Sequence, residues 1–316
     1  MLYKNSIKIL FSNFSLVWKS LLYLMGLVFV AVMLIVLTLN PIYQLLNNAG
    51  FINKIVELYT DFLSSMDLNE LLNTIDYLLE KFVEIMNQNL PQFWFAFVCV
   101  VVIFIIFGTI ATNLVIMPNC NSLHYYMGSM NKYGFFASFS ETFGKSLKVQ
   151  LSYFIVSLPI KVINVILLVL GFKFFSSVWI LSLFIGFLMF VELTLLQSFK
   201  FTLFSGWVPT MVVLNHGVWK SLRVSIKNTF RKFPRIFSNA IGVVVTIILI
   251  NIIFGLFTFM AGLLISVPAS FLLYSAFGTV ATYETQGMRY YVDVCNVVTP
   301  QKRELTDKLN NMKYIV

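Results

Sequence analysis

The 316-residue chain is 59% hydrophobic and 11% charged, with a mean hydropathy of +0.86. This composition excludes an ordinary soluble domain, in which about a quarter of the residues are charged. The net charge of +9 would suit a nucleic-acid-binding protein, but nearly all of it lies between long apolar runs. We therefore expect membrane lipids, and no nucleic acid, as its partner. The three cysteines are widely spaced and predict no disulfide framework.

The first 92 residues combine a basic start, an apolar run and an acidic stretch. Residues 1–20 contain three lysines and no acid, and their apolar residues recur at helical spacing, which predicts a surface helix. Residues 21–39 are uncharged and too long for a signal-peptide core, so they predict a first membrane span. Residues 40–92 hold seven acids against two lysines and show two amphipathic helical patterns. They predict a helical cap outside the cytoplasm.

Five further apolar runs predict the other membrane spans, at 93–117, 151–172, 178–199, 238–259 and 263–283. At about 1.5 Å per residue, such runs can cross a hydrocarbon core of roughly 30 Å. Residues 201–214 form a shorter run interrupted by Gly206 and Pro209, which favours an interfacial or re-entrant piece.

The distribution of basic residues orients the predicted spans. Segments 1–20, 118–150 and 200–236 are basic, whereas 40–92 is acidic. Because basic loops stay in the cytoplasm, six spans place both termini there. We expect a multi-pass protein of the cell membrane, a bacterial plasma membrane.

Lys161 and Glu192 are charges inside predicted spans. Counted from Ser176 in the predicted turn 173–177, Lys161 lies 15 residues back and Glu192 lies 16 residues on. The two would therefore share one depth in an antiparallel helix pair, and a lone charge at that depth costs about 2.5–3.5 kcal/mol. Either they line a cavity, in which Lys161 meets an anionic headgroup or substrate or Glu192 carries a proton, or they form a structural ion pair. Asn164, one turn from Lys161, fits both hypotheses.

Residues 216–237 predict a helix with one apolar and one basic side. The basic side carries Lys220, Arg223, Lys227 and Arg231. Such a helix would bind anionic lipid of the cytoplasmic leaflet at about 1 kcal/mol per basic residue, or would only determine topology. In the last span, Ser275, Gly278, Thr279 and Thr282 share one face and predict close helix packing, while Asn251 predicts a hydrogen bond between helices.

A short pattern recurs along the chain. Ser6-Ile-Lys-x-x-Phe11-x-x-Phe14 returns as Ser225-Ile-Lys-x-x-Phe230-x-x-Phe233, and Ser138, Thr142, Phe143 and Lys145 form a looser third copy. Each copy leads into two predicted spans. The predicted fold is therefore an all-α, polytopic helical membrane protein, with six transmembrane helices arranged as three parallel hairpin units.

This repeated organisation, with Phe-Ser-Glu-Thr-Phe-Gly-Lys-Ser at 139–146 and Trp-Lys-Ser-Leu-Arg-Val-Ser at 219–225, resembles a group of bacterial membrane families. They are the polytopic families around YciC and the membrane domain of glycerophosphodiester phosphodiesterases. The resemblance implies the membrane architecture and no catalytic residue.

The sequence contains no HExxH, GxSxG, Walker A or GxGxxG motif, which argues against an enzyme. Cys120, His124, His216 and Cys295 match no zinc spacing, so no metal or cofactor is expected. The leading hypothesis is a non-enzymatic membrane protein that transports or accommodates a lipid-like or amphipathic molecule near Lys161 and Glu192. The alternative is a scaffold or accessory subunit that binds other proteins through the cap 40–92 or the C-terminal tail 284–316.

Overall fold

A computed structural model gives the fold and describes residues 2–65, 68–293 and 295–300. The protein is almost entirely helical, and six helices within these ranges are long and apolar enough to cross a membrane. They are Ser15–Asn48, Leu90–Ser129, Phe135–Ser177, Ile185–Leu214, Phe233–Phe257 and Leu263–Gln286. The predicted helical class is thus confirmed. The six candidate helices equal the predicted spans in number and are consistent with an integral membrane protein.

The chain divides into two compact units, a larger one of residues 1–24 and 112–316 and a smaller one of residues 25–111. The larger unit contains α1 (Leu2–Ser12), the start of α2 (Ser15–Asn48), α6 (Ile116–Ser129), α7 (Phe135–Ser177), α8 (Trp179–Ser182), α9 (Ile185–Phe204), α10 (Trp207–Leu214), α11 (Val218–Arg231), α12 (Phe233–Phe257) and α13 (Leu263–Gln286), followed by β1 (Tyr290–Asp293) and β2 (Asn296–Val298). The smaller unit contains the rest of α2, α3 (Phe51–Ser65), α4 (Leu68–Gln88), α5 (Leu90–Ile105) and the π-helix η1 (Ile106–Ala111).

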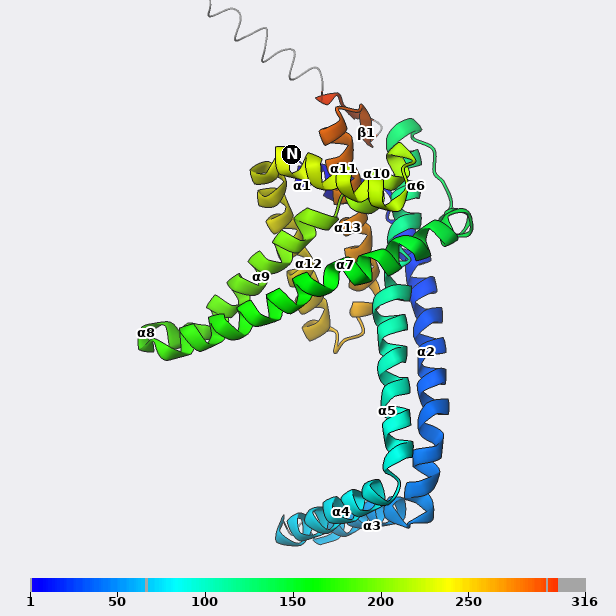
Figure 1. Ribbon diagram of the computed structural model, residues 1–316, viewed down its shortest axis with the longest axis vertical. Coiled ribbons are helices and arrows are strands. Elements are labelled where there is room, and N and C mark those ends of the chain that lie inside the picture. The colour runs from blue at the N-terminus through cyan, green and yellow to red at the C-terminus, as the bar shows by residue number, and fades with distance from the viewer. Residues whose placement is uncertain (1, 66–67, 294, 301–316) are drawn as a thin grey trace, which may run out of the picture. The chain divides into compact units, whose positions relative to one another are not determined.

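Helix α13 lies at the centre of the larger unit, packed against α1, α6, α10 and α12 (Figure 1). Its second half is buried almost without interruption. Gly278 lies so close to the backbone oxygen of Ser205 that a side chain there would overlap it. The small-residue face predicted for the last span is therefore a site of close helix packing.

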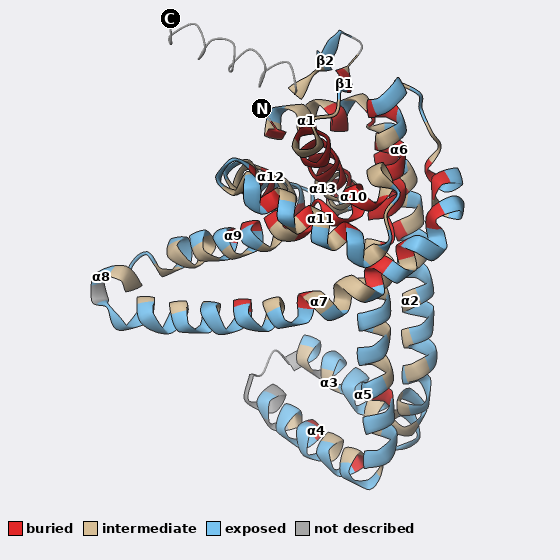
Figure 2. Cartoon of the chain, turned by 45° about the horizontal axis from the view of Figure 1, so that its top comes forward, coloured by how far each residue is buried: buried red, intermediate tan, exposed pale blue. Residues whose placement is uncertain are grey.

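Away from this centre, the helices present apolar side chains to their surroundings. Figure 2 shows α2, α5 and the outer parts of α7 and α9 as mostly exposed. Phe29, Phe95 and Ile155 are each about two-thirds exposed or more, at 67%, 71% and 66%. Apolar surface of this extent suits contact with lipid chains rather than water.

The hairpin of α7 and α9 differs from its predicted boundaries. Helix α7 begins at Phe135, so much of the predicted loop 118–150 is helical, and it continues through the predicted turn. Ser176 and Ser177 donate their hydroxyl hydrogens to the carbonyls of Lys173 and Phe174, which lets both serines stay in the helix. The chain reverses later, through α8, before α9 begins.

Residues 201–214, predicted as an interfacial or re-entrant piece, are helical with a break at Ser205 and Gly206. Their first part completes α9 and the rest forms α10, which packs against α6, α11 and α13. Trp207 and Met211 are buried among these helices. This run is apolar because it faces protein on several sides, and its Gly206 permits close approach of Ser225 on α11.

A short antiparallel hairpin, β1–β2, follows α13 and was not predicted. Its turn is closed by Asp293, whose carboxylate accepts hydrogen bonds from the backbone N–H of Cys295 and the side chain of Asn296. The tail predicted to bind a partner is 284–316, of which residues 301–316 lie outside the described residues.

In the smaller unit, α3 and α4 form where two amphipathic helices are predicted, and they pack against each other. The ring of Phe82 lies 5.9 Å from the rings of both Phe51 and Phe93. Much of the apolar face nevertheless stays exposed, as Tyr59 and Leu72 show at 64% and 58%. The two helices alone do not enclose a core.

The three copies of the repeated pattern have matching burial. Their serines, Ser6, Ser138 and Ser225, are buried, and the phenylalanines five residues later, Phe11, Phe143 and Phe230, are exposed. Each copy therefore turns its small residue toward the protein and its ring outward.

Candidate functional site

A cavity of about 320 Å³ lies among the apolar helices of the larger unit. Side chains from α6, α7, α9, α10, α12 and α13 line it. Its aromatic lining consists of Tyr153, Phe204, Trp207, Phe271 and Tyr274, and its polar lining of Asn113, Gln150, Asn251 and Ser270. A mostly apolar cavity with a few polar groups is the usual form of a site for a small ligand.

The aromatic wall is held in a fixed arrangement. The ring of Tyr153 meets that of Phe204 edge-on at 5.4 Å between centroids, and Trp207 lies 6.3 Å from Tyr153. The indole Nε1–H of Trp207 donates to the carbonyl oxygen of Val218 at 2.9 Å. Because these contacts set the ring positions, the wall is pre-formed and needs little ordering when a ligand binds.

Asn251 is tied to the neighbouring helix, as its position in the sequence predicts. Its amide donates to Ser270 Oγ at 2.9 Å and accepts from Ser266 Oγ at 2.7 Å. These bonds join α12 to α13 beside the cavity, so the role of Asn251 is to hold two walls together.

Lys200 lies against a ring of this aromatic wall, and Lys161 lies near Lys200. Lys200 Nζ is 5.9 Å from the centre of the Tyr153 ring, and Lys161 Nζ is 5.6 Å from the centre of the Phe154 ring. The two lysine charges are near enough to repel each other. Within the described ranges, neither forms an ion pair with a carboxylate. The aromatic faces compensate each charge only in part, by about 0.5–2 kcal/mol.

The predicted pairing of Lys161 with Glu192 is not observed. The carboxylate of Glu192 lies directly against Gly171, where a side chain would collide with it. Gly171 is ten residues beyond Lys161, about 15 Å along a helix. The cause is the late reversal of the chain, which shifts the register of α9 against α7 and brings the end of α9, with Lys200, level with Lys161.

Glu192 and Asn164, the other residues of the predicted site, are both at least partly buried in the structure. Glu192 Oε2 is buried and has no hydrogen-bond partner among the described residues. Asn164 is buried on α7. The structure thus brings Lys161 near a second lysine and places Glu192 in a separate contact between α7 and α9.

The basic residues predicted to contact anionic lipid, Lys220, Arg223, Lys227 and Arg231, are all exposed on α11. The helix packs on the protein through Ser221, Ser225 and Thr229. Its apolar side is left partly free, since Phe230 is 60% exposed. This arrangement leaves both the apolar and the basic side open to a membrane surface.

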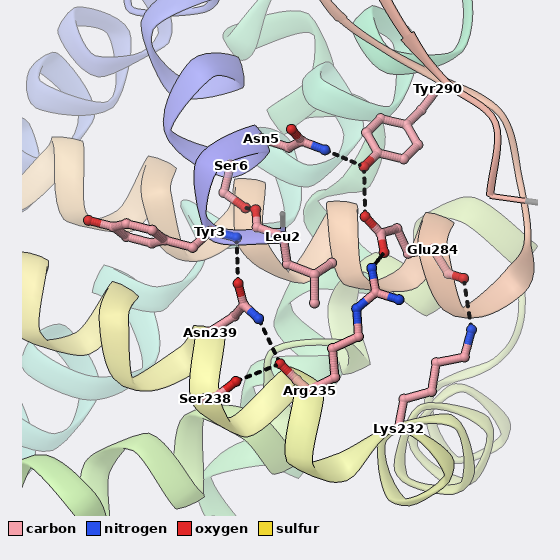
Figure 3. A network of polar contacts seen from close by, with 10 residues as sticks. All are labelled: Leu2, Tyr3, Asn5, Ser6, Lys232, Arg235, Ser238, Asn239, Glu284 and Tyr290. Atoms are coloured by element: carbon pink, nitrogen blue, oxygen red, sulfur yellow. Dashed lines mark hydrogen bonds and ion pairs between the residues drawn. The ribbon is translucent and has the colours of Figure 1, made fainter. Parts of the chain in front are cut away.

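A partly buried ion pair joins the half-exposed Arg235, at the start of α12, to the buried Glu284, at the end of α13 (Figure 3). Tyr290 donates its hydroxyl hydrogen to Glu284 Oε1 at 3.1 Å, and Asn5 Nδ2 donates to the Tyr290 oxygen at 2.8 Å. Burial and the Glu284 charge raise the pKa of Tyr290, which keeps its phenol protonated. The network joins α1, α12, α13 and β1.

The sequence carries a signal for this pair at the two ends of its longest uncharged stretch. Arg235 and Glu284 are the charged residues that directly flank the long uncharged stretch 236–283. Since α12 and α13 are antiparallel neighbours, residues at the two outer ends of that stretch meet.

The cysteines and histidines do not assemble into a metal site. The Nδ1 atom of His124 lies 2.7 Å from the hydroxyl of Tyr283, and Cys120 is buried. No three His, Cys, Asp or Glu side chains gather in the part of the chain that the structure describes.

Comparison with known proteins returns no match, whether to a protein family, a curated protein or a solved structure. Function is therefore inferred from the residues and geometry of the chain itself.

Proposed function

We propose that this protein accommodates or transports an anionic, lipid-like or amphipathic molecule in the cavity beside Lys161 and Lys200. The observation that carries the proposal is the position of Lys200 over Tyr153, a ring that lines an apolar aromatic cavity, with Lys161 near Lys200. Neither lysine has a carboxylate partner in the described structure. A charge inside a membrane costs about 2.5–3.5 kcal/mol, so an anionic ligand group would offset a real penalty.

The proposed site has a basic part and an aromatic part, which match the polar and the apolar end of such a molecule. The lysine ammonium groups would meet a phosphate or carboxylate, and the rings of Tyr153, Phe204 and Trp207 would contact its apolar part. No reaction is required of any residue, so the proposed protein is not an enzyme. Anionic lipid at the exposed basic side of α11 belongs to the same proposal.

Replacing both lysines, as Lys161→Gln with Lys200→Gln, is expected to weaken binding of an anionic lipid roughly 30-fold, from about 1 kcal/mol for each charge. Native mass spectrometry of the purified protein with phosphatidylglycerol measures this. The matched control is Lys132→Gln with Lys173→Gln, which removes the same charge from exposed positions outside both proposed lipid contacts. An equal loss of lipid in both double variants would refute a specific role for Lys161 and Lys200.

The proposed topology has six spans in three parallel hairpins, both termini in the cytoplasm and α3–α4 as an external cap of a bacterial plasma membrane protein. The matching burial of Ser6, Ser138 and Ser225 supports three equivalent units. The positive-inside rule supports the orientation. A distant kinship with the YciC-type families is part of this proposal.

In a variant without native cysteines, Lys54→Cys is expected to react with a membrane-impermeant maleimide in intact cells, because α3 lies outside. Lys227→Cys on α11 should react only after the membrane is permeabilised. Both positions are exposed on the protein, so a difference in labelling between them would not come from burial of either side chain. Labelling of Lys227→Cys in intact cells would reverse the proposed orientation.

A scaffold role is the second candidate, favoured by the exposed apolar residues of α3 and α4. In that case a partner protein covers the two helices. Tyr59→Ser with Leu72→Ser would then release a co-purifying partner while leaving lipid binding at Lys161 and Lys200 unchanged.

A further inference from the structure

A second hollow, of about 690 Å³, opens on the surface of the larger unit between α7 and the connection from α10 to α11. Lys145, Lys148 and His216 supply its basic lining, and Leu151, Met211 and Trp219 supply part of its apolar lining. It shares no lining residue with the cavity beside Lys161 and Lys200.

The connection that forms one wall is fixed on both sides. Asn215 adopts a left-handed backbone conformation, with φ of 48°, and thereby ends α10 and reverses the chain. Lys145 Nζ donates to Asn215 Oδ1 at 3.4 Å, and Trp207 holds the carbonyl oxygen of Val218. The segment that carries His216 and Trp219 is therefore held in place by these hydrogen bonds.

The charge in the hollow is not compensated by its own lining, which contains no acid. The nearest acid in sequence on α7, Glu141, lies one helical turn before Lys145 and accepts a hydrogen bond from the hydroxyl of Tyr133 at 3.1 Å. Two exposed ammonium groups, one imidazole and the side-chain hydroxyl of Ser152 thus surround the same space. Groups of this kind bind phosphate oxygens.

The apolar lining indicates what else the ligand carries. Trp219 is 62% exposed and Leu151 is 45% exposed, although both border a basic hollow. A free inorganic ion would leave them in water, whereas a phosphate ester with an apolar chain would cover them. Tryptophan beside lysine is also the arrangement found where a protein surface meets lipid headgroups.

We propose that this hollow binds the phosphate of an anionic phosphate ester, with an anionic phospholipid as the ligand. Lys145 and Lys148 contact the phosphate, and Trp219 and Leu151 contact the glycerol and the first part of the acyl chains. This site is distinct from the cavity beside Lys161 and Lys200, and it stands even if that cavity has no ligand.

The test uses the full-length protein in detergent, titrated with dioctanoyl phosphatidylglycerol, dioctanoyl phosphatidylcholine or glycerol 3-phosphate, with tryptophan fluorescence as the readout. We expect a saturable response to phosphatidylglycerol and a much weaker one to phosphatidylcholine. Trp219→Phe should remove this response, while binding measured by native mass spectrometry persists. A response to glycerol 3-phosphate as strong as that to the lipid would confirm the phosphate site and identify its ligand as a soluble ester.

Lys145→Gln with Lys148→Gln is expected to weaken the Trp219 response roughly 30-fold, from about 1 kcal/mol per lysine. The control, Lys132→Gln with Lys173→Gln, removes equal charge from exposed positions outside the hollow and should leave the response unchanged. Lys161→Gln with Lys200→Gln should also leave it unchanged, which separates this site from the proposed cavity. Equal losses in the first two variants, equal responses to both lipids, or no saturable response would overturn the proposal.

Discussion

Gly278→Ala is expected to lower the free energy of unfolding by about 3 kcal/mol, an unusually large effect for one methyl group. The added Cβ would overlap the backbone oxygen of Ser205, and a backbone atom at the junction of α9 and α10 cannot rotate away as a side chain can. Helix α13 would have to move, although it contacts five other helices of the larger unit. Thermal unfolding of the purified protein, followed by intrinsic fluorescence in detergent, measures the change.

Gly144→Ala is the matched control for this substitution. Gly144 also lies in a long helix, α7, but no atom lies within 4 Å of the position that its Cβ would take. There the exchange removes backbone freedom from the unfolded chain and should stabilise by about 0.5–1 kcal/mol. If both variants unfold at the temperature of the parent protein, α13 does not pack as closely as the structure describes.

Arg235→Ala is expected to lower the free energy of unfolding by about 2–3 kcal/mol. Loss of one partner of a buried ion pair costs about 3–5 kcal/mol, and the half-exposed side chain of Arg235 reduces that figure. The carboxylate of Glu284 would keep only the hydroxyl of Tyr290 as a partner among the side chains described. Because Tyr290 also binds Asn5, we expect α1 to loosen together with the hairpin β1–β2.

The control is Arg223→Ala, which removes the same side chain from an exposed position of α11. Hydrogen exchange of the N-terminal segment, measured alongside thermal unfolding, distinguishes loosening of α1 from a general loss of stability. If both arginine substitutions change thermal unfolding and hydrogen exchange equally, the Arg235–Glu284 network does not stabilise the position of α1.

The sequence was sufficient to predict the helical class, the number of helices able to span a membrane and the close packing of α13, because each depends on composition or helical spacing within one segment. It was insufficient for the register of α7 against α9. That register depends on where the chain reverses, and Ser176 and Ser177 resemble a turn although their hydroxyl groups bond to carbonyls of their own helix. An error of a few residues there moved the expected partner of Lys161 from the end of α9 to Glu192.

The candidate site could be predicted only in part. Lys161 stands out in an apolar run, but the cavity beside it is formed by residues from helices far apart in sequence, such as Tyr153 and Phe271. No pattern within one segment predicts a volume enclosed by several helices. The network around Glu284 was missed for a related reason, since Asn5 and Tyr290 belong to opposite ends of the chain.

The most direct test of the proposed function is an experimental structure of the protein in lipid nanodiscs that contain phosphatidylglycerol. We expect elongated density in the cavity lined by Tyr153, Phe204 and Trp207, with its polar end within hydrogen-bonding distance of Lys161 or Lys200. A cavity that is empty or closed by its own side chains, with both lysines turned toward water or paired with carboxylates, would contradict the proposal.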